Sequence, residues 1–93
     1  MSALQKIRRK VSNSQFIIGR HVFDKLEELG LTAEDVFLVV KYGELVNELT
    51  DDPRGIRFLV LGRTQDLTRS LEVVCRFLPA GLLRIITVYQ LEE

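Results

Sequence analysis

The chain contains one histidine, His21, and imidazole is the side chain whose unperturbed pKa lies nearest neutrality. Such a group can act as the general base or acid in cleavage of an RNA backbone. That reaction also needs cations to stabilise the charge on the phosphorane-like transition state, and Arg57, Arg76 and Arg84 lie in apolar runs that could supply them. The alternative role for His21, at the start of a helical pattern, is capping or packing.

One imidazole cannot supply both the acid and the base, so Lys25 and Tyr89 are further candidates for proton transfer. We expect no cofactor and no metal. Cys75 is the only cysteine, the pair Asp51-Asp52 is a turn signal, and no glycine-rich phosphate loop or Gly-x-Ser-x-Gly motif occurs. Nucleotide hydrolysis and serine-type acyl transfer are therefore disfavoured.

The 13 basic and 13 acidic residues cancel over the whole chain but not locally. Residues 1–25 carry a net charge of +5, residues 26–52 carry −7, and residues 53–93 carry +2 with arginine as their only cation. Guanidinium is a planar fork that suits phosphate or carboxylate, so this distribution favours a charged partner. The alternative explanation is that solvated faces of the protein differ in the sign of their charge, or that the arginines pair with Glu48 and Glu72.

A chain of 93 residues with 46% hydrophobic residues supports one core, so we expect a single domain over residues 1–93. It would comprise a basic N-terminal helix within residues 1–12 and a core over residues 16–93. Hydrophobic residues at helical spacing predict three helices, which cover Ser2 to about Val11, Arg20–Leu29 and Thr32–Gly43. Gln15 to Ile18 is a brief extended piece. No signal peptide or membrane span is expected, which favours a cytoplasmic protein.

After Gly43 the period of the hydrophobic pattern changes to about two. Four runs separated by turn signals predict strands over Leu45–Leu49, Ile56–Leu61, Leu71–Leu78 and Leu82–Tyr89. The predicted fold class is therefore α+β, with two to three N-terminal helices packed on one face of a four-stranded antiparallel meander sheet.

Strict alternation along these strands predicts that four charged side chains converge on the face that the helices leave uncovered. These are Arg57, Glu72, Arg76 and Arg84. Apolar residues would surround them, namely Leu59, Leu61, Val74, Ile86 and Val88. A half-apolar, arginine-bearing face favours a protein partner, a nucleic acid or a second copy of the chain.

The string from Arg20 to Val36 resembles the opening of domain-of-unknown-function family 4258, within or near the BrnT and RelE/ParE toxin-like superfamily. In that family a His-Ala pair leads one helix, which ends in Arg-Gly-Ile-Ser, and a Glu-Asp-Val helix follows. Further strings match in the same order, namely Tyr42–Glu44, Arg57–Gly62, Leu71–Val74 and Ile85–Tyr89. The resemblance covers residues from about Phe16 to Tyr89.

The resemblance implies helices packed against an antiparallel sheet and, in toxin members, a ribosome-dependent or free ribonuclease that a cognate antitoxin protein neutralises. It implies catalytic roles for His21, Arg57, Arg84 and Tyr89. This chain departs from the family pattern, because Lys25 stands where an arginine is usual and Leu29 replaces a second one. The basic N-terminal helix is an addition.

Three hypotheses follow. The first is a metal-independent endoribonuclease in which the four catalytic residues named above act on RNA, with Lys25, Glu72 and Arg76 binding the substrate. The second is a catalytically inactive module that binds a protein or dimerises through its open sheet face. The third is an RNA-binding protein without cleavage, which rests on the basic segment Lys6–Lys10.

Overall fold

The computed structural model describes residues 1–91, so Glu92 and Glu93, which belong to the predicted domain span and to the C-terminal charge, lie outside the described residues. Along the chain the elements are α1 (Ala3–Ser12), β1 (Phe16–Ile18), α2 (Arg20–Leu29), α3 (Ala33–Tyr42), β2 (Glu44–Leu49), β3 (Arg57–Arg63), β4 (Ser70–Phe77) and β5 (Leu83–Leu91). None of these helices is long and apolar enough to cross a membrane.

The helices begin and end at the residues that the sequence indicates. At α1, the Ser2 hydroxyl accepts a hydrogen bond from the Gln5 backbone N–H, and the Gln5 side chain accepts one from the Ser2 N–H. Gly30 ends α2 in the left-handed conformation, with φ of 71°. At the start of α3, the Asp35 carboxylate accepts from the backbone N–H of Thr32. Local capping therefore explains the start of α1, the end of α2 and the start of α3.

The strands form one sheet in the order β1-β5-β4-β3-β2. Strands β2 to β5 make the predicted antiparallel meander. The prediction of a purely antiparallel, four-stranded sheet is wrong, because β1 pairs with β5 in parallel orientation and adds a fifth strand at the edge. A strand of three residues is too short to show alternation, so its pairing left no pattern in the sequence.

A β-bulge interrupts the pairing of β4 with β5. Val74 pairs with Thr87, but the next residue of β4, Cys75, pairs with Ile85. Ile86 is therefore an extra residue on β5. Beyond it, every side chain of β5 lies on the face opposite to the one that strict alternation predicts.

The bulge corrects two face assignments. Val88, predicted to share a face with Arg84, is completely buried and lies on the core face, as Leu83 does. Tyr89, predicted to lie on the covered face, pairs with Glu72 and so lies on the same side of the sheet as Glu72, opposite to the core. The bulge therefore moves one of the proposed catalytic residues to the same side of the sheet as the arginines.

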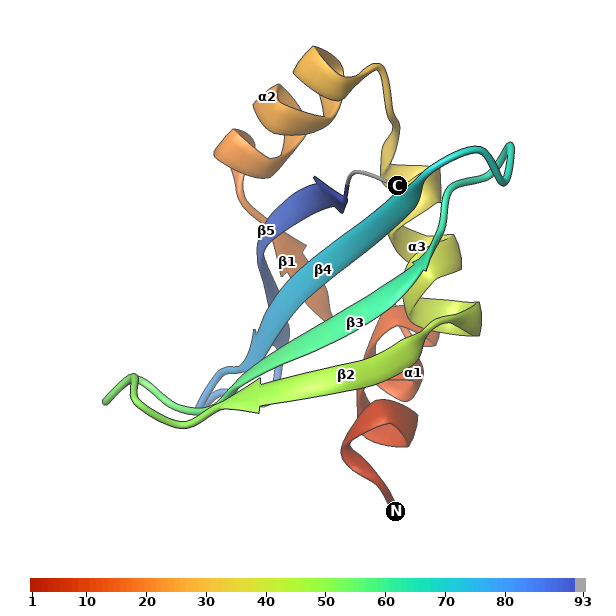
Figure 1. The fold of residues 1–93 in the computed structure, drawn as a ribbon. Coiled ribbons are helices and arrows are strands. Elements are labelled where there is room, and N and C mark those ends of the chain that lie inside the picture. The colour runs from red at the N-terminus through yellow and green to blue at the C-terminus, as the bar shows by residue number, and fades with distance from the viewer. Residues whose placement is uncertain (92–93) are drawn as a thin grey trace.

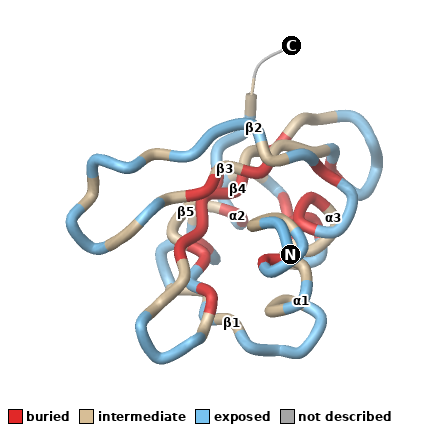
Figure 2. The backbone as a smooth tube through the Cα atoms, turned by 90° about the horizontal axis from the view of Figure 1, so that it is seen from below, coloured by how far each residue is buried: buried red, intermediate tan, exposed pale blue. Residues whose placement is uncertain are grey.

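Helices α1 and α3 pack on one face of the sheet, and α2 packs alongside β5, past the end of the short β1 (Figure 1). The core lies between these helices and the sheet, and exposed residues surround it in loops, helices and strands (Figure 2). Its fully buried side chains include Ile7, Val22, Val36, Val60 and Leu71. The opposite face of the sheet carries no helix over β2, β3 and β4 in Figure 1. We call this side of the sheet, including the same side of β5, the open face.

Candidate functional site

Arg57, Arg76 and Arg84 occupy neighbouring positions on three adjacent strands, and we call them the arginine row. Arg76 and Arg84 are register partners. Phe58 pairs with Cys75, so Arg57 and Arg76 each lie one position from that pair, on the other side of the sheet. Because Phe58 and Cys75 belong to the core, the arginine row lies on the open face, as predicted.

Two members of the arginine row are paired with carboxylates of the loop between β2 and β3. The Nη2 atom of Arg57 donates a 3.0 Å hydrogen bond to Asp51 Oδ1. The Asp52 Oδ2 atom lies 3.7 Å from Nη1 of Arg76 and 3.9 Å from Nε of Arg57. Arg54 adds two further hydrogen bonds to the Asp52 carboxylate, at 3.1 and 3.0 Å. The arginines therefore pair with Asp51 and Asp52 and not with Glu48 or Glu72.

Arg84 differs from its two neighbours. Its side chain is exposed, and it makes no ion pair with any residue from 1 to 91. Its register partner on β1 is the exposed Ile17. Arg84 is therefore the member of the arginine row that an approaching anion can contact first.

The hydrogen bonds from Arg54 lower the pKa of the Asp52 carboxyl from 3.8 to about 2, and the charge of Arg76 acts in the same direction. Asp52 therefore stays ionised at any physiological pH. The four cations of this region, Arg54 and the arginine row, exceed its two aspartates, so a net positive charge remains.

A second group of predicted residues gathers at the other end of the open face. The Lys25 ammonium lies over the aromatic face of Tyr89, with 4.2 Å between Nζ and the ring centroid. Glu72 is the register partner of Tyr89. His21 precedes Lys25 by four residues on α2, so both lie on the same side of that helix. We call these four residues the β5 cluster.

His21 is exposed and makes no hydrogen bond with another residue of the described chain. Its ring lies near the start of α2, because a Cβ atom placed on Gly19 would be 3.4 Å from Nδ1. An exposed imidazole without a fixed partner is accessible to a substrate, but no second side chain fixes its tautomer or its orientation.

The arginine row and the β5 cluster lie at different places along the same strands. Arg76 and Glu72 are four residues apart on β4, which corresponds to about 13 Å at the usual rise of a strand. One phosphate group cannot contact both sets of side chains. An extended nucleic acid strand that follows β4 and β5 could contact both at once.

The apolar residues predicted for the open face are largely shielded. Val74 is only 4% exposed, and Leu59, Leu61 and Ile86 are half-buried. Of the predicted set, Val88 is in the core because of the bulge. The open face thus presents charged and polar groups more than a continuous apolar patch.

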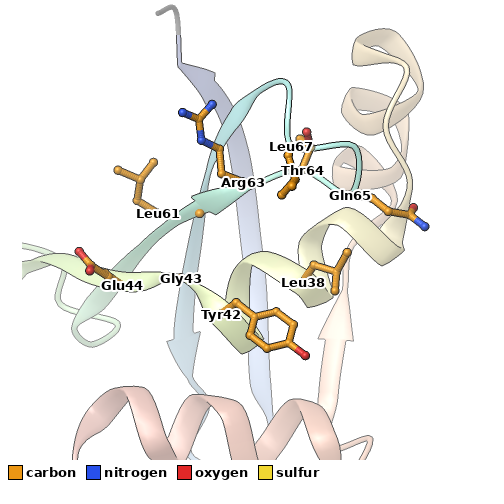
Figure 3. Close-up of a pocket in the computed structure, with 10 residues that line it drawn as sticks. Leu38, Tyr42, Gly43, Glu44, Leu61, Arg63, Thr64, Gln65 and Leu67 are labelled. Carbon is orange, nitrogen blue, oxygen red and sulfur yellow. The ribbon is translucent and has the colours of Figure 1, made fainter.

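A groove of about 500 Å³ opens at the junction of α3 with β2 and β3 (Figure 3). Leu38 and Tyr42 of α3 form one side, and Leu61 and Leu67 form the other. None of the residues predicted to act on RNA lines it.

The described residues contain no cluster of three His, Cys, Asp or Glu side chains that could hold a metal ion. Burial raises the pKa of the Cys75 thiol to about 12, so this thiol is not a nucleophile at neutral pH.

The two aspartates that engage the arginine row were missed as functional residues by sequence reasoning, which read them only as a turn signal. A signal was present, because Asp51 and Asp52 lie five to six residues before Arg57 in the loop of a hairpin. A loop of that length can fold back on the first residues of the returning strand. The contact of Asp52 with Arg76, which lies on β4, could not be predicted without the register of the whole sheet.

Comparison with known proteins gives one match. The family described as "Domain of unknown function (DUF4258)" matches the chain over residues 18–90, from the end of β1 almost to the end of β5. No curated protein and no solved structure gives a significant match. Helix α1 precedes the matched segment. Since the match covers well over half of the sequence, the chain belongs to the family of domain of unknown function DUF4258.

Proposed function

We propose that this protein is a toxin-like, metal-independent endoribonuclease, and that its RNA substrate lies along β4 and β5 on the open face. The single observation that carries the proposal is the β5 cluster, in which Lys25 of α2 holds the Tyr89 ring beside Glu72. The packing of the helices on one face of the sheet supports the relation to the BrnT and RelE/ParE group, which is part of the proposal.

The proposed reaction is attack of a ribose 2′-oxygen on the adjacent phosphorus. His21 accepts the proton of the 2′-hydroxyl while the new bond from oxygen to phosphorus forms. The bond from phosphorus to the 5′-oxygen breaks, and the Tyr89 hydroxyl, positioned by Lys25, donates a proton to that leaving oxygen. Arg84 and the net positive charge around it attract the RNA backbone. The products are a 2′,3′-cyclic phosphate and a 5′-hydroxyl end.

The test uses the purified chain and a fluorophore-labelled single-stranded RNA, in buffer with a chelator. The matched DNA oligonucleotide is the first control, because it lacks the 2′-hydroxyl. Loss of the proton-transfer group in His21→Ala or Tyr89→Phe should lower the cleavage rate by roughly 10²- to 10⁴-fold. Cleavage of the DNA, or equal rates for the parent and His21→Ala, would contradict the proposal.

The chain provides a matched control for the cation and ring pair. Lys41 lies over the Tyr42 ring at 5.3 Å, on α3 and away from the open face. Tyr42→Phe and Lys41→Ala should therefore leave cleavage unchanged.

Induction in bacteria tests ribosome-dependent activity, with growth and mRNA integrity followed for the parent and His21→Ala. An intact RNA pool and normal growth in both strains would exclude ribosome-dependent cleavage of mRNA.

A second candidate function is RNA binding without cleavage. It is favoured over cleavage because no described side chain orients the exposed His21, and because two arginines are paired with the protein's own carboxylates and are less available to stabilise a transition state. In this case the parent binds RNA with an affinity that falls as salt increases, and no cyclic phosphate product forms.

A further inference from the structure

The loop between β2 and β3, residues 50–56, contacts two members of the arginine row. Asp51 accepts a hydrogen bond from Arg57, and Asp52 lies within ion-pair distance of Arg57 and Arg76. The backbone of the loop also approaches Arg76, because a Cβ atom placed on Gly55 would lie 3.6 Å from its Cδ atom. The loop therefore brings both its carboxylates and its backbone against the arginine row.

These carboxylates lie where an external anion would bind. The Asp52 and Arg76 side chains are only 8% and 10% exposed, so their contact is shielded from water. Carboxylate and phosphate oxygens accept hydrogen bonds from guanidinium groups in similar geometry. An internal carboxylate can therefore occupy a site that also fits a phosphate group.

The hydrogen bonding between the loop and the arginine row is incomplete. The Nε atom of Arg57 is buried and has no hydrogen-bond partner, since its nearest Asp52 oxygen is 3.9 Å away. A buried donor without an acceptor is energetically costly. An anion with more acceptor oxygens than a carboxylate could satisfy it.

We propose that Asp51 and Asp52 occupy a binding site for a backbone phosphate of RNA, and that residues 50–56 withdraw when RNA binds. The inference rests on the proposed function and adds the regulation of its substrate surface. RNA first contacts the exposed Arg84, and a phosphate then displaces the carboxylates from Arg76 and Arg57. Opening depends on this competition and not on protonation, because Asp52 remains ionised.

The test compares two double variants by fluorescence anisotropy over a series of salt concentrations. The probe is a fluorescein-labelled single-stranded RNA with 2′-O-methyl groups, which the proposed reaction cannot cleave because the attacking 2′-hydroxyl is blocked. Asp51→Asn/Asp52→Asn removes the competing carboxylates. Glu44→Gln/Glu48→Gln removes the same charge from exposed positions of β2. The aspartate variant should bind about tenfold more tightly than the glutamate variant, and its salt dependence should steepen by about 0.7 for each additional phosphate that the arginines neutralise. Equal affinities in the two variants would overturn the inference.

Hydrogen exchange of the unmodified protein provides a measurement that needs no variant to fold. Amide exchange in residues 50–56 should accelerate when the same 2′-O-methyl RNA is added to saturation, because the loop leaves the sheet. Slower exchange there would mean that RNA seals the loop in place, which contradicts the inference.

The two proposals can fail separately. If the parent cleaves RNA and the aspartate variant binds no better than its control, the loop does not cover the site, but the ribonuclease proposal survives. If no variant cleaves RNA and the aspartate variant alone binds tightly, the phosphate site stands and the catalytic proposal falls.

Discussion

The Nη2 atom of Arg8 donates a 2.7 Å hydrogen bond to the carbonyl oxygen of Gly43. Its Nε atom donates to the carbonyl oxygen of Val40 over 2.9 Å. Both acceptors lie at the C-terminal end of α3, where the last carbonyl groups lack partners within the helix and carry partial negative charge. Arg8 thus ties α1, which precedes the family match, to the turn from which β2 starts.

Replacement of this arginine should lower the stability of the fold. Arg8→Ala removes two hydrogen bonds from a charged donor, and we expect the free energy of unfolding to fall by about 1.5–3 kcal/mol. Urea unfolding followed by circular dichroism measures the loss. Arg9→Ala, at the exposed neighbouring position, should change stability by less than about 0.5 kcal/mol. Equal effects of both substitutions would show that the Arg8 contacts contribute nothing.

Gly43 should tolerate no larger residue. A Cβ atom at this position would lie 2.4 Å from the backbone oxygens of Leu61 and Val39, and these atoms cannot move without disturbing β3 or α3. Gly43→Ala should therefore destabilise the fold by about 3 kcal/mol, the upper end of the usual cost of overpacking.

Gly30→Ala is the matched control for this substitution. Gly30 has φ of 71°, but no atom lies within 4 Å of the added Cβ, so only the backbone conformation is penalised. Its cost should be about 1–2 kcal/mol. If Gly43→Ala is the more stable of the two variants, the close approach of β3 to the end of α3 is not tight.

The helices and the position of the arginine row could be predicted because local residues determine them. The Ser2 and Gln5 capping box and the left-handed Gly30 each lie within a few residues of the helix end that they define. No β-bulge separates Arg57 from the turn before β3, or Arg76 from the turn after β4. Both residues therefore follow strict alternation. In such segments the face of a side chain follows from its position.

The remaining features depend on contacts between distant segments. The bulge at Ile86 has no glycine or proline to mark it, and the face of Tyr89 depends on it. Lys25 and Tyr89 meet only because α2 packs beside β5. The contact of Asp52 with Arg76 joins a loop to a strand that is not its neighbour in sequence. Hydrophobic period alone contains none of this information.

Acid should remove the stabilising contribution of Asp66, which lies in the loop between β3 and β4. Hydrogen bonds from Thr68 and Thr64 lower the pKa of Asp66 from 3.8 to about 2. A folded pKa below the unfolded value means that this contribution to stability is complete above about pH 5, where the unfolded carboxyl is also ionised, and is lost as the pH falls to about 2. Asp52 has the same sign and the same range.

The measurement is urea unfolding at a series of pH values from 5 to about 2, the range that the lowered pKa values define. The parent should lose stability over this range, and Asp66→Asn should lose less of it because the titrating group is absent. Asp24→Asn removes an exposed carboxylate on α2 and should leave the acid dependence as in the parent. An Asp66→Asn curve parallel to that of the parent would contradict the assignment.

Leu67 combines two unfavourable features, and their removal should stabilise the protein. Its φ of 63° is left-handed, which costs a residue such as leucine about 1–2 kcal/mol. It is also 72% exposed, so its side chain recovers little by burial. Asparagine adopts this conformation more readily, and Leu67→Asn should raise the free energy of unfolding by about 0.5–1 kcal/mol. Leu67→Ala separates the two features, because alanine removes the exposed side chain and keeps the backbone penalty. Urea unfolding should therefore place Leu67→Asn above both Leu67→Ala and the parent. A parent more stable than Leu67→Asn would show that the groove contacts of Leu67 stabilise the loop more than its backbone strains it.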